Sequence, residues 1–347
     1  MAVLLLTSAA GAPGVTSTAL GLALWWPREV VLVDADPHPC HAVEAGYLGG
    51  RGRAGGGLPE LARVHRQGGD LTAALWSQLI DLPRPEDLAR SSRPAFSRPV
   101  SSRPVSSRPV SSRTVSSRTA GTAAVEPIGE GVDRDGDGDG NGEAARDGGG
   151  EPAHLLPGFG HPAQPSLFQA VWPALSTSLV ELDQAGVDVI VDLGRAPSGA
   201  GGAAGIGLPG DLVARSCLLG VVVRAGLRSL AGLSLHRDQI DALVAGTTAT
   251  VGLVLIGAGH PYSAHEIRRQ FGLPVLAEVA EDPRAAAVLS DGVGITSGSL
   301  PRGWGRGRYV SSLRHGASVL HRQMARHAGL ADPELLEEPG AGAEEAT

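Results

Sequence analysis

The sequence predicts an α/β protein with three layers, in which a mostly parallel sheet carries helices on both faces. Two observations predict this fold. Apolar runs such as Val30 to Asp34 lack the alternation of a half-exposed strand, as expected for strands buried on both faces. Segments with helical spacing separate these runs, and strands that alternate with helices build a parallel sheet. A low-complexity insert interrupts the pattern.

The first predicted strand, Ala2 to Thr7, runs into a glycine-containing loop. A helix follows at Thr16 to Trp26, where leucines recur at helical spacing until Pro27 ends it. The alternation then repeats. Further strands are predicted at Val30 to Asp34, Val187 to Asp192, Leu218 to Arg224, Thr250 to Ile256 and Leu273 to Ala277, and further helices at Ser166 to Gln184, Ser229 to Ala245, Ala264 to Phe271 and Tyr309 to Met324.

Composition predicts one domain in two parts, residues 1–90 and 154–330, around an insert at 91–153. The insert begins with an SSRPV-type repeat in which arginine is the only charge, and continues as an acidic, glycine-rich run. Neither part can build a core, so we expect the insert to be disordered. We expect the same of the acidic tail at 331–347.

The overall composition excludes several classes of protein. A net charge of −7 argues against nucleic-acid binding by the whole chain. The 2 cysteines give no disulfide framework, and we see no signal peptide and no apolar run long enough to span a membrane. We therefore expect a cytoplasmic protein. The arginine repeat leaves open a nucleic-acid-binding role of its own, although the adjacent acidic run can neutralise it.

The loop SAAGAPGVTST, Ser8 to Thr18, has the pattern of a phosphate-binding loop without its lysine. A strand that runs through glycines into a helix presents backbone N–H groups and a positive helix end to an anion. Gly11 and Gly14 allow close approach, and Thr16 or Ser17 could hold a magnesium ion. The alternative is a tight turn capped by Thr16. The loop alone does not separate the two interpretations.

Carboxylates follow two of the predicted strands. The second strand ends in DADPH, which contains Asp34 and Asp36, and a later strand ends in VDLGR, which contains Asp192. In a parallel sheet these positions converge near the glycine loop. A carboxylate there is costly unless it caps, pairs or contacts a metal. The combination favours a nucleotide site.

Together these motifs resemble the deviant Walker A ATPases of the MinD and ParA family, within the CobQ/CobB/MinD/ParA superfamily of P-loop NTPases. GAPGVTST stands where that family has GGVGKTT, VLVDADP resembles its second strand, and VIVDLG resembles its Walker B strand. The segment from Gly272 to Gly292 resembles the family's late strand, acidic loop and helix. The loop also has the G-x-P-G-V-T form of MinD-like proteins from GC-rich bacteria.

The resemblance implies binding of ATP and magnesium at named residues. The phosphate loop would be Gly11, Ala12, Pro13, Gly14, Val15, Thr16 and Ser17. Magnesium would be held by Thr16, Asp34 and Asp192, and Asp36 would ready the attacking water in an active enzyme. The family's two lysines fall at Ala10 and Val15, and the chain contains no lysine at all. Arg195 or Arg224 could substitute in part.

These departures lead to three functional hypotheses. The first is a MinD/ParA-like homodimer with an impaired nucleotide site that acts, through an unidentified protein partner, as a regulator or scaffold in positioning, partitioning or assembly. The second is a working ATPase that uses arginine in place of lysine, so whether the protein is an enzyme stays open. The third is nucleic-acid binding through the arginine repeat, which we regard as the weakest.

Three smaller patterns have plainer interpretations. Residues 133–144 imitate a calcium loop but have Ala144 where a glutamate is required, which favours an acidic linker. His38, Cys40 and His41 could ligate zinc, but no second ligand pair is evident and an ordinary loop is favoured. The apolar face of the predicted helix from Tyr309 to Met324 favours packing on the sheet over membrane binding, because an acidic tail follows it.

Overall fold

The computed structural model describes residues 3–9, 14–38, 41–50, 56–92, 151–195, 209–327 and 329. All of them belong to one compact unit. The arginine repeat, the calcium-like loop and the acidic tail therefore lie outside the described residues. So do Ala10, Gly11, Ala12, Pro13 and Cys40 of the predicted sites.

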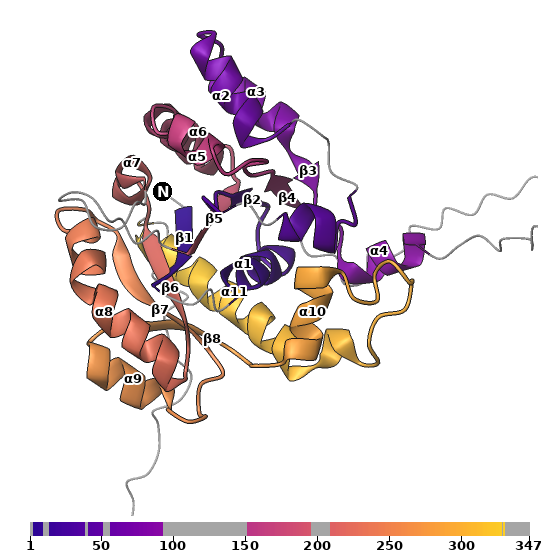
Figure 1. The fold of residues 1–347 in the computed structure, drawn as a ribbon, viewed down its shortest axis with the longest axis vertical. Helices are drawn as coiled ribbons and strands as arrows, with labels where there is room; N and C mark the ends of the chain where they lie inside the picture. The colour runs from indigo at the N-terminus through magenta and orange to yellow at the C-terminus, as the bar shows by residue number, and fades with distance from the viewer. Residues whose placement is uncertain are drawn as a thin grey trace, which may run out of the picture. The chain divides into compact units, whose positions relative to one another are not determined.

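Strands and helices alternate along the chain (Figure 1). The elements are β1 (Val3–Ser8), α1 (Val15–Leu24), β2 (Val30–Asp34), η1 (Ala42–Tyr47), α2 (Leu58–Arg66), α3 (Leu71–Gln78), β3 (Ile80–Asp81), α4 (Pro85–Ser92), β4 (Ala153–Leu156), α5 (Gln164–Leu167), α6 (Trp172–Gln184), β5 (Asp188–Arg195), α7 (Gly210–Ala214), β6 (Leu218–Arg224), α8 (Leu227–Val244), β7 (Thr250–Ile256), α9 (Ala264–Phe271), β8 (Val275–Val279), α10 (Pro283–Asp291), η2 (Trp304–Arg306) and α11 (Arg308–His327).

The strands form one 8-stranded sheet in the order β3-β4-β2-β5-β1-β6-β7-β8. Every described pairing is parallel except that of β3 with β4. The central strand β1 lies between β5 and β6, and β2 lies on the far side of β5. The predicted mostly parallel sheet is confirmed. Its order brings the carboxyl ends of β2, β5 and β1 together.

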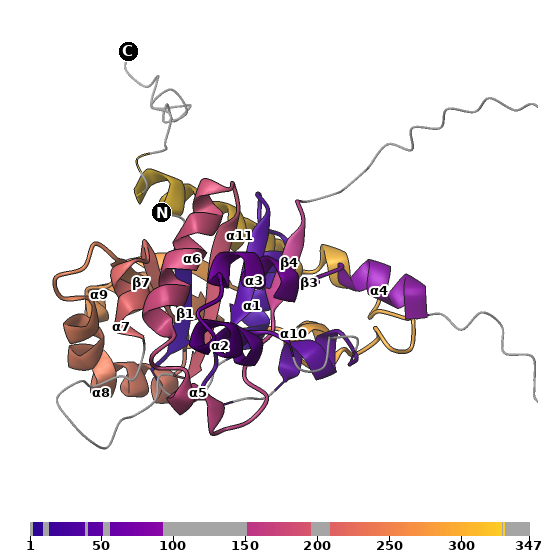
Figure 2. The same cartoon turned by 90° about the horizontal axis from the view of Figure 1, so that it is seen from above.

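Helices cover both faces of the sheet (Figure 1, and turned by 90° in Figure 2). Each face has its own hydrophobic core. One core packs α1, η1, α10 and α11 against the sheet. The other packs α2, α3, α6, α7, α8 and α9. Alternate residues of β1 enter opposite cores, Leu4 and Leu6 the first and Val3 and Leu5 the second, as the two-residue period of a strand requires. The three layers of the predicted fold are confirmed.

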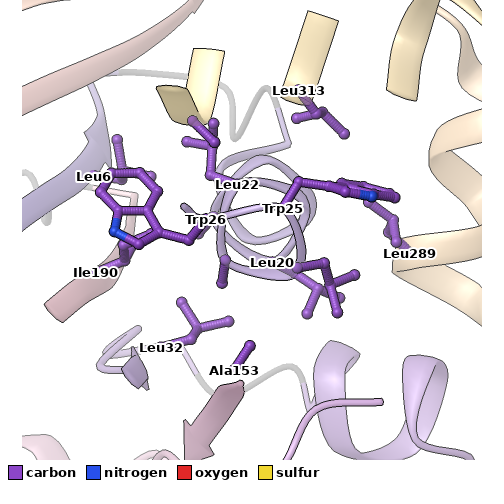
Figure 3. Packing of buried hydrophobic residues seen from close by; sticks show 14 of the residues in the cluster. Leu6, Leu20, Leu22, Trp25, Trp26, Leu32, Ala153, Ile190, Leu289 and Leu313 are labelled. Carbon is purple, nitrogen blue, oxygen red and sulfur yellow. The ribbon is translucent and has the colours of Figure 1, made fainter. Parts of the chain in front are cut away.

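Helix α1 is buried on nearly all sides, and this packing fixes the position of its first turn, where the candidate loop ends. Figure 3 shows Leu20, Leu22, Trp25 and Trp26 radiating from this segment into the surrounding core. Gly21 provides the room for α11, because a Cβ there would lie 2.6 Å from a methyl carbon of Leu313. A helix held on every side positions its first turn rigidly.

Helix α11 packs against β8 and α1. Its buried face is formed by Tyr309, Val310, Leu313, Gly316, Ala317, Leu320 and Met324. The predicted packing of this apolar face is therefore observed. Among the described residues, no helix combines the length and apolarity that crossing a membrane requires.

The structure corrects some predicted element boundaries. The single helix predicted from Ser166 to Gln184 is wrong, because α5 ends at Leu167 and α6 begins at Trp172. Each of these helices has a proline in its first turn, and a proline cannot donate the hydrogen bond that would continue a preceding helix. The last strand is shifted from its predicted start at Leu273 to Val275, directly after Pro274. The short strands β3 and β4 were not predicted.

Candidate functional site

The turn into α1 has a left-handed residue at its end. Gly14 has φ 93° and ψ 40°, a conformation that favours glycine, and it is the N-cap residue of α1 without a side-chain cap. The Thr18 N–H donates to the Gly14 carbonyl at 3.0 Å, and the Ser17 hydroxyl donates to the same oxygen at 3.3 Å. The alternative in which Thr16 caps the helix is therefore wrong. Thr16 instead stands in the first turn, where backbone N–H groups lack partners within the helix.

Val15 stands where the family resemblance expects a lysine, and it carries no charge. Its side chain is 4% exposed and belongs to the core around α1. The position where the family resemblance expects a lysine therefore contributes apolar packing in this chain. A positive charge at the site has to come from elsewhere in the structure.

The predicted carboxylates do converge at the ends of the strands. Asp34 of β2 and Asp192 of β5 are opposite each other in the parallel register, and Leu6 of β1 is opposite Asp192 on the other side. Asp36 follows two residues after Asp34, and its backbone N–H lies 3.4 Å from Asp34 Oδ1. The structure thus brings the three carboxylates to the edge of the sheet where α1 begins.

Two glycines that the sequence reasoning missed make room for these carboxylates. A Cβ on Gly158, which follows β4, would lie 2.7 Å from the carboxyl carbon of Asp34. A Cβ on Gly194, which has φ 58°, would collide with the carboxylate of Asp36. Gly194 also donates its N–H to Asp192 Oδ1 at 2.8 Å and accepts from the Thr7 hydroxyl at 3.2 Å. Gly194 therefore organises two of the three carboxylates.

Burial and mutual repulsion raise the proton affinity of this cluster. Desolvation is the largest cause that raises the pKa of Asp34 to about 8, and the charge of Asp192 adds to it. Desolvation also raises the pKa of Asp192 to about 6, while the Thr16 hydroxyl and the Gly194 N–H lower it. Burial raises the pKa of Asp36, and His38 and Arg195 oppose that rise. At neutral pH the Asp34–Asp192 pair therefore retains a proton in the absence of a cation.

The donor set fits a magnesium ion that is completed by phosphate and water. Asp192 Oδ2 is buried and has no hydrogen-bond partner in the described part of the chain, and the Thr16 hydroxyl lies beside this carboxylate. The described residues contain no group of three or more His, Cys, Asp or Glu side chains that could hold a metal by themselves. Magnesium commonly uses one or two carboxylates together with phosphate oxygens and waters. Thr16, Asp34 and Asp192 would hold it here.

A pocket of about 360 Å³ opens over the first turn of α1. Its lining residues are Gly14, Val15, Thr16, Ser17, Asp36, His38, Ala42, Gly194, Arg195 and Ser290. Arg195, the last residue of β5, is exposed and is the one arginine that the described residues contribute to this lining. His38 lies 3.6 Å from Asp36 Oδ1 and donates its backbone N–H to that oxygen at 2.8 Å. The His38–Cys40–His41 run is only partly within the described residues and carries no zinc site there.

The far wall of the pocket is formed where η1 meets α10. Ala42, the first residue of η1, and Ser290 of α10 both line the pocket. A Cβ on Gly46 would collide with the Ser290 carbonyl, and a Cβ on Gly292 would collide with the Gly46 carbonyl. The two backbones therefore touch directly at this joint. A π-helical turn such as η1 often occurs at functional sites.

Sequence reasoning found the carboxylates and missed much of the pocket wall. His38 and Arg195 were noted individually, but their place in one pocket follows from the strand order. Ser290 lies almost a hundred residues further along the chain than Arg195 and has no local signal of its own. The positive φ of Gly194 does have a local signal in the sequence. A glycine near the end of a buried strand, two residues after Asp192, often marks a special backbone conformation.

The free energy of unfolding should depend on pH because Asp34 and Asp192 share a proton in the folded state. Their folded pKa values of about 8 and about 6 lie above the reference value of 3.8, so their contribution to stability is complete below pH 3.8 and is lost as pH rises through both values. Without magnesium, Asp34→Asn should therefore raise the free energy of unfolding at pH 8.5, on the order of 2 kcal/mol, and change it little at pH 4.

Urea denaturation in EDTA at the two pH values measures this difference. The exposed residue Asp238 provides the matched control, because Asp238→Asn removes a carboxylate outside the cluster. An equal effect of Asp34→Asn at both pH values would show that the pair does not share a proton.

No family model and no curated protein matches the chain by sequence. Solved structures match it in fold. A ParA family ATPase from Chlorobium tepidum TLS is 12% identical, with a TM-score of 0.54, and the match covers 91% of this chain and 98% of that one. The septum site-determining protein MinD from Pyrococcus horikoshii OT3, complexed with Mg-ADP, is 14% identical, with a TM-score of 0.51 and coverage of 95% and 98%. Apo McdA from Cyanothece is 14% identical, with a TM-score of 0.53 and coverage of 92% and 99%.

The eight-stranded, mostly parallel sheet, with a turn from its central strand into a buried helix, defines the fold of a P-loop NTPase. Within that class the chain has the fold of the MinD and ParA ATPases. At sequence identities of 12–14% this likeness defines the fold and not an activity.

Proposed function

We propose that this chain is a MinD/ParA-like P-loop protein with an impaired nucleotide site that acts as a regulator or scaffold in cellular positioning, partitioning or assembly. The observation that carries the proposal is the first turn of α1. Gly14 and this turn would offer backbone N–H groups to an anion, while Val15 is buried against the core and the sequence contains no lysine. Backbone N–H groups alone bind phosphate weakly.

The cluster of carboxylates makes magnesium necessary for this binding. Asp34, Asp36 and Asp192 would repel a triphosphate, and within the pocket lining Arg195 is the only arginine that offsets them. A magnesium ion at Thr16 and Asp192 would neutralise both the carboxylates and the phosphate. We therefore propose weak, magnesium-dependent binding of ATP, and a homodimer as the assembled state, in keeping with the MinD and ParA fold.

Calorimetric titration with Mg·ATP tests the site. The wild-type protein should bind with a Kd of about 1 mM, because a missing charge near phosphate shifts micromolar binding toward millimolar. Phosphate release should stay at the background rate. Thr16→Val keeps the shape of the side chain and removes its hydroxyl, so it should abolish the magnesium dependence of binding. Thr177→Val on the exposed side of α6 provides the control.

A second candidate function is ATP hydrolysis that uses arginine in place of lysine. The specific observation in its favour is that Arg195 lines the same pocket as Thr16 and Asp36. Steady phosphate release from the wild-type protein, lost in both Asp36→Asn and Arg195→Gln, would support this candidate over an impaired site. Sedimentation with and without Mg·ATP would then show whether nucleotide drives dimer formation.

A further inference from the structure

A second, smaller hollow adjoins the candidate phosphate site. It has a volume of about 40 Å³, which is room for about one water molecule. Gly14 and Ser17 line both this hollow and the larger pocket. Arg224 and Glu281 also line it. A ligand seated at the start of α1 therefore borders the hollow directly.

An ion pair closes this hollow across the end of a strand. Arg224 is the last residue of β6, and its guanidinium pairs with the carboxylate of Glu281, which follows β8. Strand β7 lies between β6 and β8, so the pair spans the carboxyl end of β7. Gly257, directly after β7, makes this path possible, because a Cβ there would lie 2.8 Å from Glu281 Oε2.

The pair is well placed to exchange partners. The side chains of Arg224 and Glu281 are 46% and 47% exposed, and ion pairs with such exposure contribute little to stability. A phosphate offers arginine the same paired acceptor geometry as a carboxylate, with more negative charge. Among the described residues, Arg195 lines the larger pocket and Arg224 lines the small hollow, where it pairs with the carboxylate of Glu281.

We propose that Arg224 is a phosphate ligand that Glu281 masks. A nucleoside polyphosphate bound at Gly14 and Ser17 competes with Glu281 for the guanidinium, and the exchange frees Arg224 to pair with the phosphates. The proposal rests on the proposed function, since it requires an anion at the start of α1. Arg224 thereby supplies a positive charge to the phosphates from a position other than those of the two missing lysines. Glu281 weakens ATP binding until it releases the guanidinium.

Two substitutions that each remove one charge of the pair should change binding in opposite directions. Glu281→Gln releases Arg224 and should tighten Mg·ATP binding about 3- to 10-fold, whereas Arg224→Gln should weaken it by a similar factor. The double variant should bind like Arg224→Gln alone, because Glu281 acts only through Arg224. Calorimetry on the full chain measures all four proteins, and circular dichroism with thermal melts confirms that each is folded.

Asp241→Asn provides the matched control. Asp241 also pairs with an arginine, Arg237, and is 49% exposed, but it lies on α8 and lines neither hollow. Its substitution removes the same charge as Glu281→Gln and should leave ATP binding unchanged. A gain equal to that of Glu281→Gln would show a general electrostatic effect and overturn the proposal.

The other outcomes separate this proposal from the proposed function. If both Glu281→Gln and Arg224→Gln bound Mg·ATP more tightly, the ion pair would only obstruct the site, and the role of Arg224 as a phosphate ligand would be overturned. Wild-type binding that neither substitution changes would overturn this inference and leave the nucleotide site intact. If neither the wild-type protein nor any variant bound Mg·ATP, both the site and the masked ligand would be refuted.

Discussion

Replacing Ala10 with lysine should strengthen Mg·ATP binding by at least about tenfold. The family resemblance places a signature lysine at this position, where it would reach the phosphates across a dimer. A unit charge about 4 Å from a phosphate is worth roughly 4 kcal/mol at an effective dielectric near 20, before desolvation is subtracted, and each 1.4 kcal/mol is tenfold in affinity. Calorimetry on wild-type and Ala10→Lys proteins under identical salt conditions measures the gain.

A matched variant separates charge from size at this position. Ala10→Met adds a side chain of similar length without a charge and should bind ATP like the wild-type protein. Equal gains from Ala10→Lys and Ala10→Met would show that packing and not charge limits binding. No gain from the lysine would show that the loop is only a turn between β1 and α1.

The other lysine position should behave differently, because Val15 is buried in the core. Val15→Lys would place an ammonium group among apolar side chains unless the first turn of α1 rearranged, and burial of an unpaired charge is strongly unfavourable. We therefore expect Val15→Lys to strengthen ATP binding less than Ala10→Lys.

Asp188→Ala should cost about 3 to 5 kcal/mol of the free energy of unfolding, because it leaves buried polar partners without their acceptor. The Asp188 side chain is 1% exposed at the amino end of β5. It accepts from Trp26 Nε1 at 2.7 Å and from Arg28 Nη1 at 2.9 Å, and His321 Nε2 lies 3.5 Å away. This carboxylate therefore joins the end of α1, strand β5 and helix α11.

Urea denaturation of Asp188→Ala and Asp188→Asn measures this contribution. The asparagine variant keeps one acceptor oxygen for Trp26 or Arg28 and should lose less stability than the alanine variant. Asp238→Ala, at an exposed position of α8, is the control and should stay within about 0.5 kcal/mol of the wild-type protein. A loss from Asp188→Ala as small as that of the control would contradict the role of this network.

The strands were predictable from sequence where burial on both faces left a strong apolar signal. Strands β2, β6 and β7 have the predicted boundaries. The edge strand β3 and its neighbour β4 escaped prediction because they have only 2 and 4 residues and follow or precede segments with no periodicity. Long strands at the centre of a sheet carry their own signature, whereas short edge strands form because a neighbour is present.

The part of the candidate site that lies at the carboxyl ends of the strands was predictable from the sequence. Asp34, Asp36 and Asp192 could be placed together because parallel strands deliver their carboxyl ends to one edge. The burial of Val15 depends on how α1 is packed, and the pairing of Arg224 with Glu281 depends on which strands are neighbours. Such contacts between distant segments have no counterpart in local sequence patterns.

The joint between η1 and α10 determines how selective the pocket can be for ligand size. Gly46 and Gly292 bring two main chains into contact, and the same two elements carry Ala42 and Ser290 into the pocket wall. A substitution changes side chains and leaves the main chain in place, so the position of this wall is set by the fold. Divergence among related chains would then change the charge around the ligand far more readily than the width available to it.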